Sequence, residues 1–388
     1  MLHWLAISIA ILTTTLTMCA LGYYLAVLVA ARVFLAGRRR SQTGFAPAVS
    51  VLKPLKGLDP GMLEAFRSHC QQQYAGPFEL IFGVASEDDP AAGAVRQLAA
   101  EFPQIPIRLV ICPARLGTSG KVSSLCQMLP AARHPYILIN DSDILVGPHY
   151  LARVMAGFAP EDGSKPVGMV TALYRGRAHR TLGSRLEAMT ILEFISGVLL
   201  SRLIEGGLSY GLGSTLAVSR EALDKSGGLK PLLNELADDY QLGLRIHRAG
   251  YRVALGPEVV ETAIPAYGWR EYVDHQLRWM RTVRDSRPAG YAGLVFTQGL
   301  ALALVNVAVC QASSLSLGLL GAGLILRLAA ASVVGTAVLD DAATLPWLWL
   351  MPLRDLVAAG LWLTGLAGNT IVWRGERYRL KNGRLHPL

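Results

Sequence analysis

The clearest pattern in this chain is an almost unbroken run of apolar residues near its start. From Trp4 to Leu35 the run carries one charge, at Arg32, and three arginines, Arg38 to Arg40, follow it. About 20 apolar residues are enough for a helix to cross the hydrocarbon core of a bilayer. A signal peptide would have a shorter apolar core with a small-residue cleavage site after it. The run therefore predicts an uncleaved membrane anchor.

Three more apolar segments lie in the C-terminal third, at Leu294 to Leu315, Leu317 to Leu339 and Leu345 to Val372. Basic residues flank them, and the positive-inside rule places such residues on the cytoplasmic side. With the middle of the chain inside, three full crossings would leave the basic tail outside. We therefore expect two to three membrane segments here, and suspect that one of the three apolar stretches does not cross.

Charged residues interrupt two of these segments. The second contains Arg327, and the third contains Pro352, Arg354 and Asp355, which are unusual on lipid-facing helices. Arg354 and Asp355 could pair locally at an interface. Alternatively, the third segment is bent or re-entrant, or lines a groove through which a lipid enters.

Between these apolar ends, short runs rich in Val and Ile alternate with longer stretches of helical character. The expected strands are Val49–Leu52, Glu79–Val84, Ile107–Ile111, Tyr136–Ile139 and Val167–Thr171, and the expected helices include Gly61–Gln73, Ala91–Glu101 and Lys121–Leu129. This alternation predicts an α/β domain with a mostly parallel sheet. We divide the chain into an anchor with its basic flank (1–40), a catalytic domain (41–288), C-terminal membrane segments (289–372) and a basic tail (373–388).

Composition agrees with a membrane protein. Of the 388 residues, 52% are hydrophobic, and the net charge of +9 comes largely from basic residues that flank apolar segments. Such residues are attracted to anionic headgroups. No basic patch with interleaved aromatic residues stands apart from the membrane segments, so nucleic acid is not an expected partner. The five cysteines have no C-x-x-C spacing, which fits a reduced compartment.

Acidic motifs follow two of the predicted strands. Ser86-Glu87-Asp88-Asp89-Pro90 follows the strand that ends near Val84, and Asp141-Ser142-Asp143 follows Tyr136–Ile139. Ligands of parallel α/β sheets bind beyond the carboxyl ends of the strands. Asp141 and Asp143 suit a hard divalent cation, Mg²⁺ or Mn²⁺, shared with substrate phosphates. The alternative is a turn in which an Asp side chain caps backbone N–H groups.

A third acidic motif, Ala237-Asp238-Asp239-Tyr240, opens a stretch with helical apolar spacing. One interpretation is a helix N-cap, where Asp is favoured. The other is catalytic, because a carboxylate aimed into a pocket can remove a proton from an acceptor hydroxyl. Both can hold at once, since a helix N-terminus stabilises a carboxylate. Asp239 and Asp238 are therefore candidate catalytic residues.

The last motif, His275-Gln276-Leu277-Arg278-Trp279, lies in a helical run just before the first C-terminal apolar segment. It could be an amphipathic helix at headgroup level. The functional alternative has Arg278 neutralising a diphosphate leaving group and Trp279 shaping the acceptor floor. Lys53, Lys56 and Lys121 are further candidates for phosphate contact, although a solvated surface lysine is the plainer interpretation of each.

Taken in order, these motifs resemble the ceramide glucosyltransferase family (family 21), membrane-bound inverting glycosyltransferases with a GT-A fold. The match spans nearly the whole chain, from Val49–Gly57 to the tail at 373–380. The resemblance implies that Asp88 contacts the nucleotide, Asp141 binds the metal-diphosphate and Asp239 is the general base. Arg278-Trp279 ends the family's (Q/R)xxRW motif. His275 departs from its first position, and Asp143 is not shared by every member.

Within that family, residues 284–293 resemble the bacterial branch that glycosylates hopanoids. The resemblance implies transfer of N-acetylglucosamine from its UDP-sugar to bacteriohopanetetrol, and we favour this acceptor over ceramide, to which glucose would be moved. The enzyme would lie in the bacterial inner membrane with its catalytic domain in the cytoplasm. A processive polysaccharide synthase would need a wider membrane bundle to export polymer. A catalytically dead scaffold would not need three intact acidic motifs at predicted strand ends.

Overall fold

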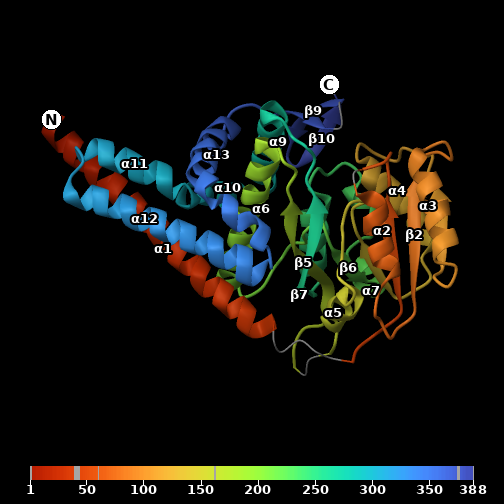
Figure 1. The fold of residues 1–388 in the computed structure, drawn as a ribbon. Coiled ribbons are helices and arrows are strands. Elements are labelled where there is room, and N and C mark those ends of the chain that lie inside the picture. Colours follow the sequence, from red (N-terminus) through yellow and green to blue (C-terminus); the bar gives the residue numbers. More distant parts are fainter. Residues whose placement is uncertain (1, 39–43, 60, 161–162, 374–375, 388) are drawn as a thin grey trace.

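The protein is described here from a computed structural model that places residues 2–38, 44–59, 61–160, 163–373 and 376–387. Arg39 and Arg40, which were part of the predicted basic flank, lie outside the described residues. Figure 1 shows an α/β domain and a group of long helices that extends away from it. The helices α6 (Leu182–Ile204) and α9 (Trp269–Ser286) lie between these two regions.

The α/β domain is built on one seven-stranded sheet. Its strands are β1 (Val49–Pro54), β2 (Phe78–Val84), β3 (Ile107–Ile111), β4 (Tyr136–Ile139), β5 (Val167–Arg177), β6 (Leu216–Ser219) and β7 (Arg252–Ala263). They are ordered β3-β2-β1-β4-β6-β5-β7. In this sheet β6 runs antiparallel to both of its neighbours, whereas the other pairs are parallel. The predicted fold class, with a mostly parallel sheet, is therefore confirmed.

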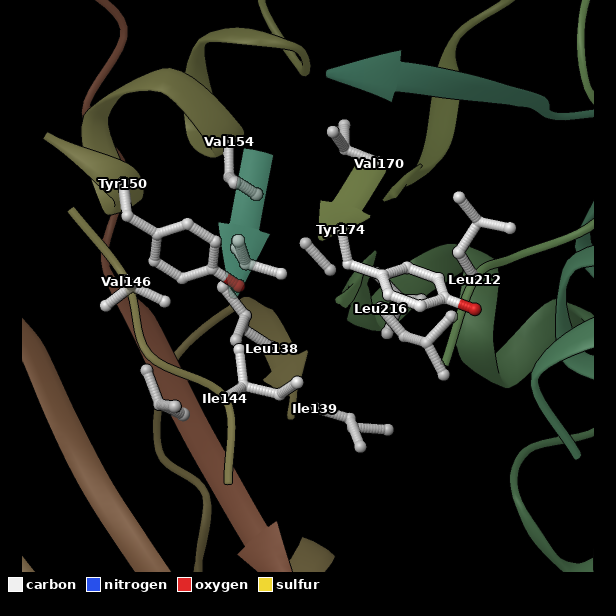
Figure 2. Close-up of a cluster of buried hydrophobic side chains, with 14 of the residues drawn as sticks. Leu138, Ile139, Ile144, Val146, Tyr150, Val154, Val170, Tyr174, Leu212 and Leu216 are labelled. Carbon is white, nitrogen blue, oxygen red and sulfur yellow. The ribbon is translucent and has the colours of Figure 1, made fainter. Parts of the chain in front are cut away.

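Helices cover the sheet and bury the apolar runs that predicted the strands. They are α2 (Met62–Cys70), α3 (Pro90–Glu101), α4 (Gly120–Met128), α5 (Tyr150–Ala156), α7 (Arg220–Lys225) and α8 (Asp238–Arg248). Strands buried on both faces are apolar at successive positions, and Val49, Val51 and Leu52 have no exposed surface. Figure 2 shows part of this core, in which Leu138 of β4 lies near Tyr150 of α5.

The N-terminal anchor is one long helix, α1 (Leu2–Arg38), which packs against α11 (Gly299–Val309) and α12 (Ser314–Val333). Among the described residues, two helices are long and apolar enough to cross a membrane, 3–38 and 314–338. A third crossing is possible if 288–297 and 299–309, which meet at 60°, form one broken span. The fold therefore offers two or three spans.

The third predicted segment, Leu345 to Val372, is not one straight span. It divides into a 3₁₀ helix (Ala342–Leu350), α13 (Met351–Gly365) and the strand β8 (Thr370–Trp373). Pro352 stands in the first turn of α13, where its missing N–H costs no hydrogen bond. At 15 residues, α13 is shorter than a typical membrane-spanning helix.

The charged residues in these segments form one buried network. Arg354 does pair with its neighbour, at 3.0 Å from Asp355 Oδ1, but Asp355 also receives both Nε and Nη2 of Arg327. Glu193 of α6 lies 2.9 Å from Arg327 and accepts the Tyr23 hydroxyl of α1. Two arginines and two acids balance one another, which is the condition for burying charge. The network ties α12 and α13 to α6.

The tail forms a second sheet. Its strands β8, β9 (Glu376–Lys381) and β10 (Arg384–Pro387) are antiparallel. The backbone of this sheet bonds to the α/β domain, from Leu236 N to Gly383 O and from Leu385 N to Asn234 O, each at 3.0 Å. The tail must therefore lie on the same side of a membrane as the α/β domain. This requires an even number of crossings between them.

Candidate active site

Asp141 and Asp143 lie just past the carboxyl end of β4, where ligands bind in sheets of this kind. Asp141 Oδ1 lies 2.7 Å from Lys121 Nζ at the start of α4. Asp143 accepts a hydrogen bond from the hydroxyl of Thr262 in β7. Loss of hydration raises the pKa of Asp143, and the bond from Thr262 offsets only part of that effect. The two carboxylates are thus held by partners from different elements.

Two lysines bring positive charge to this edge. Lys53, at the end of β1, is fully buried and donates from Nζ to the backbone oxygen of Asp141 at 2.8 Å. Burial lowers the pKa of Lys53 to about 7, although Asp143 and Asp141 oppose the change. Burial also acts to lower the pKa of Lys121, but the carboxylates of Asp141 and Asp238 outweigh it, so this pKa is raised. The alternative that Lys53 and Lys121 are solvated surface lysines is therefore wrong.

The backbone just before Asp141 is fixed by a buried polar network. Asn140 has no exposed surface and donates from Nδ2 to the Ser214 carbonyl at 2.6 Å and the Tyr150 hydroxyl at 2.9 Å. Its Oδ1 lies 3.2 Å from His69 Nε2. Burial lowers the pKa of His69 to about 3, so the ring stays neutral and has one N–H for two nearby acceptors, Asn140 Oδ1 at Nε2 and the Ala65 carbonyl, 2.8 Å from Nδ1. This network holds the acidic turn at the end of β4.

Asp238 and Asp239 open α8, opposite the β4 turn. Ala237 holds the N-cap position, so the alternative that one of these acids is the cap is wrong. Asp238 Oδ2 lies 3.6 Å from Lys121 Nζ, which places one ammonium between two acidic motifs. Desolvation first, and then the charge of Asp238, raises the pKa of Asp239 to about 6. A Cβ at Gly213 would lie 3.0 Å from Asp239 Oδ2, so the glycine leaves room for this carboxylate.

In the first acidic motif, the neighbouring residues Asp88 and Asp89 have different environments. Asp89 caps α3 through the N–H of Ala91, and it also accepts the N–H of Gly57 from the loop after β1. Asp88 is exposed at the carboxyl end of β2. The capping role of Asp89 fixes the turn, and Asp88 remains open to solvent at the ligand-binding edge.

The α9 motif packs on α6 through a buried acid. Glu187 of α6 accepts Gln276 Nε2 at 2.6 Å, and its other oxygen lies 3.3 Å from His275 Nδ1. The His275 ring lies between Tyr267 and Trp279, with ring centroids 5.4 Å and 5.6 Å away. His275 is therefore enclosed by protein groups, in contrast to a residue that only packs among lipid headgroups.

Arg278 is half-buried on the same helix. Burial raises the pKa of Tyr267, and Arg278 lowers it, which places the guanidinium within electrostatic reach of that ring. The charge of Asp143 also acts on Tyr267. Tyr267 is therefore within electrostatic reach of both the α9 motif and the acidic turn after β4.

With this geometry established, comparison with known proteins decides the family. A sequence model described as "Glycosyl transferase family 21" matches residues 12–386. The chain belongs to glycosyl transferase family 21. The match covers the anchor, every acidic motif, the α9 motif and the tail, so the predicted family is confirmed.

Curated relatives of this family 21 chain are ceramide glucosyltransferases. Ceramide glucosyltransferase 3 of Caenorhabditis elegans is 25% identical over 239 residues, covering 61% of this chain and 50% of the relative. Ceramide glucosyltransferase of Komagataella phaffii is 32% identical over 109 residues, covering 27% and 21%. The chain thus spans about half the length of the first of these curated relatives, and less of the second.

Among solved structures, the mannosyltransferase PcManGT from Pyrobaculum calidifontis, in complex with GDP-Man and Mn²⁺, is 21% identical. The matched region covers 90% of this chain and 99% of the mannosyltransferase chain, with a TM-score of 0.47. Glucosyl-3-phosphoglycerate synthase from Mycobacterium tuberculosis, in complex with Mg²⁺ and UDP, is 17% identical, covers 70% and 83%, and has a TM-score of 0.35. Both likenesses are too distant to assign roles to residues.

The family 21 site also contains groups that the motifs did not indicate. Glu187 accepts a hydrogen bond from Gln276, and Thr262 donates one to Asp143. Asp59 accepts the Ser142 hydroxyl at 2.6 Å. The sequence could have indicated Glu187, because Glu187 and Glu193 are acidic residues in an otherwise mostly apolar helix. Thr262 and Asp59 carry no such signal, since one is an ordinary strand residue and the other an exposed loop residue.

The donor set at this site suits a divalent cation. The four carboxyl groups of Asp141, Asp143, Asp238 and Asp239 outnumber the two amino groups of Lys121 and Lys53 at this site. Among the described residues, no group of three or more His, Cys, Asp or Glu side chains would hold an ion by itself. Mg²⁺ normally takes one or two carboxylates and completes its shell with water and substrate phosphates. Asp141, whose side chain is 43% exposed, and Asp143 fit that role.

Proposed function

We propose that this chain is an inverting glycosyltransferase that moves a hexose from a UDP-sugar to the hydroxyl of a membrane lipid. One observation carries the proposal. Asp239, with its pKa raised to about 6, lies beside Asp238, which is joined through Lys121 to Asp141. A carboxylate of that pKa is ionised at neutral pH and can still accept a proton, as a general base requires.

In this mechanism Asp239 removes the proton of the lipid hydroxyl as that oxygen attacks C1 of the sugar. The UDP leaves from the opposite face, so one displacement inverts the anomeric centre. Lys121 and Arg278 offset the negative charge that develops on the leaving diphosphate. Asp88 would contact the nucleotide, and Lys53 holds the Asp141 backbone in place. Asp141 and Asp143 would hold Mg²⁺ or Mn²⁺, which would act as a Lewis acid on the diphosphate.

We further propose that the acceptor enters from the membrane side. The helix α6 packs against both β5 of the sheet and α1, and its Glu187 lies 3.3 Å from His275 of α9, at the junction between the α/β domain and the apolar helices. Trp279 lies against Phe194 of α6, with ring centroids 5.7 Å apart, and would form the floor under the lipid. The domain and its tail would then lie on the cytoplasmic side of a bacterial inner membrane, the side that the positive-inside rule gives to Arg38.

For the lipid we propose bacteriohopanetetrol, with N-acetylglucosamine as the sugar, because residues 284–293 resemble the hopanoid-glycosylating branch. A second candidate is ceramide with glucose, which the names of the curated relatives favour. Both acceptors offer a hydroxyl at the polar end of a hydrophobic body. The same base and diphosphate site would serve either one.

Two measurements test the proposal. Purified protein in lipid should release UDP from a UDP-sugar when the acceptor lipid is present, and Asp239→Asn should abolish the release. Lipid mass spectrometry of cells with and without the gene should then show loss of an N-acetylglucosaminyl hopanoid. Loss of hexosylceramide would assign the ceramide alternative. Release of long polymer would support a processive synthase, and absence of UDP release with either acceptor would refute the transferase itself.

A further inference from the structure

Tyr174 lies at the ligand-binding edge of the sheet, although no acidic or basic motif points to it. Leu216 of β6 pairs with Ile139 of β4 on one side and with Thr171 of β5 on the other. Since β6 is antiparallel to both, β4 and β5 point the same way. Their carboxyl ends therefore meet at one edge. Tyr174, three residues beyond Thr171, is then level with the turn that begins at Asp141.

The ring of Tyr174 is held by its neighbours. Only 9% of the residue is exposed, and the ring lies 6.1 Å from that of Phe194. Figure 2 shows it near Leu212 and Leu216, with the hydroxyl oxygen at the outer end, away from Leu138. The position of the hydroxyl is therefore set by packing of the ring.

The hydroxyl itself has no protein partner. Among the described residues, none donates to or accepts from Tyr174 Oη, whereas the buried Tyr150 hydroxyl meets Asn140 and Thr215. The hydroxyl oxygen is not among the fully buried polar atoms that lack a partner, so the ring is buried while its hydroxyl reaches the surface. A tyrosine held in this way at the edge of a site is suited to bind something that is not part of the chain.

The charges around Tyr174 identify what it can bind. Burial raises the pKa of the phenol, and Asp239, Glu187 and Asp141 raise it further, in that order. The hydroxyl therefore stays protonated and is a donor. Leu212, which lies near the Tyr174 ring, is followed directly by Gly213, where a Cβ would lie 3.0 Å from Asp239 Oδ2, so Tyr174 and Asp239 flank the same segment of the site. The complement of this hydroxyl is an uncharged or negative oxygen of a substrate bound there.

We propose that Tyr174 is a substrate-contacting residue whose hydroxyl donates a hydrogen bond to a substrate hydroxyl oxygen next to Asp239. The inference rests on the proposed function, because it takes the substrates to be a sugar and a lipid alcohol. That oxygen belongs either to the donor sugar or to the lipid acceptor. The two sources share one chemistry and are separated by the test below.

The test compares Tyr174→Phe with Tyr251→Phe in the full-length protein in lipid. Tyr251 also loses a hydroxyl, one that donates to Glu221 at 3.0 Å on α7, outside the site. Tyr174→Phe should lower kcat/KM by about 2- to 12-fold, the contribution of one hydrogen bond, while Tyr251→Phe keeps the wild-type rate. The thermal midpoint of Tyr174→Phe should equal that of wild type, because no bond within the protein is lost. Tyr150→Phe, which does lose internal bonds, should unfold at a lower temperature.

Two measurements show whether the oxygen that Tyr174 contacts belongs to the sugar or to the lipid acceptor. If it belongs to the sugar, Tyr174→Phe raises the KM for the UDP-sugar and slows its hydrolysis in the absence of lipid. If it belongs to the acceptor, hydrolysis is unchanged and only transfer suffers. Wild-type kinetics in Tyr174→Phe, or a thermal midpoint lowered as in Tyr150→Phe, overturns the inference. If Asp239→Asn is inactive in the same assay, such a result leaves the proposed function standing. Inactive wild-type protein would instead count against the proposed function.

Discussion

The ammonium of Lys121 lies 2.7 Å from Asp141 Oδ1 and 3.6 Å from Asp238 Oδ2, so one cation joins two acidic motifs that are nearly 100 positions apart in the sequence. Without this cation, the carboxylates of the two motifs would repel each other. Lys121 offsets that repulsion, and it stands where a diphosphate would meet the turn after β4. Its charge should therefore matter both for substrate binding and for Asp239.

Lys121→Met keeps the length of the side chain but removes its charge. Loss of a charged hydrogen bond costs about 1.5–3 kcal/mol, so UDP binding should weaken by about 10- to 100-fold by calorimetry. Because Lys121 lowers the pKa of Asp239, the variant should also need a higher pH for activity. Lys225→Met, at an exposed position on α7 outside the site, is the matched control. Equal UDP affinity in both variants would exclude Lys121 from the donor site.

Asp239→Asn keeps the size of the side chain but cannot accept a proton. Turnover should fall by at least about 10²-fold, while UDP-sugar binding stays close to that of wild type. Asp238→Asn should lower turnover less, because Asp238 acts through Lys121 and through its charge on Asp239. Near-normal turnover in Asp239→Asn would move the role of base to another residue.

The pH dependence follows from the raised pKa of Asp239, about 6. A base works only when ionised, so activity should be present above that pH. As pH falls through about 6, the carboxylate takes up a proton and kcat/KM should drop about tenfold per unit. A profile of kcat/KM against pH, with folding followed by circular dichroism, checks this. A flat profile down to about pH 5 would contradict the assignment of Asp239.

Metal removal should abolish activity. Asp141 and Asp143 suit Mg²⁺ or Mn²⁺ shared with the diphosphate, so chelation by EDTA should stop UDP release and either ion should restore it. Asp143→Asn should raise the metal concentration needed for half-maximal activity. Full activity in EDTA, with no metal found by elemental analysis, would rule out this role for both acids.

His275→Gln should stay active, because the family accepts Gln at this position and Gln can donate to Glu187. His275→Ala should lose activity, since it removes a partner of Glu187 and a ring that supports Trp279. Arg278→Ala should lose more, because it also removes a fixed charge from the leaving-group side. Wild-type rates for both His275 variants would remove His275 from the site.

Much of the fold was predictable because strands that are buried on both faces are apolar at successive positions in the sequence. The strands β1 to β4 and the first part of β5 are short apolar runs, and the acids that follow β2 and β4 were expected at one edge of the sheet. The strand β6 has only four residues, Leu216–Ser219, too few for a periodic signal. Glu187 and Tyr174 depend on how α6 and β5 pack, which local pattern does not encode. The tail strands pair with one another, but the tail sheet is attached to the domain through the distant residues Asn234 and Leu236, so the tail had been expected only as a basic extension.

That distant attachment bears on when the active site can form during synthesis. The loop at 234–236, which leads directly into Asp238, is held by backbone bonds to Gly383 and Leu385. These residues are synthesised after α12 at 314–333, and chains fold in order of synthesis. The loop therefore gains this support only after the helices that are long and apolar enough to cross a membrane have been made. Under the proposed function, the newly made chain would gain activity only when its apolar helices are already available to the membrane.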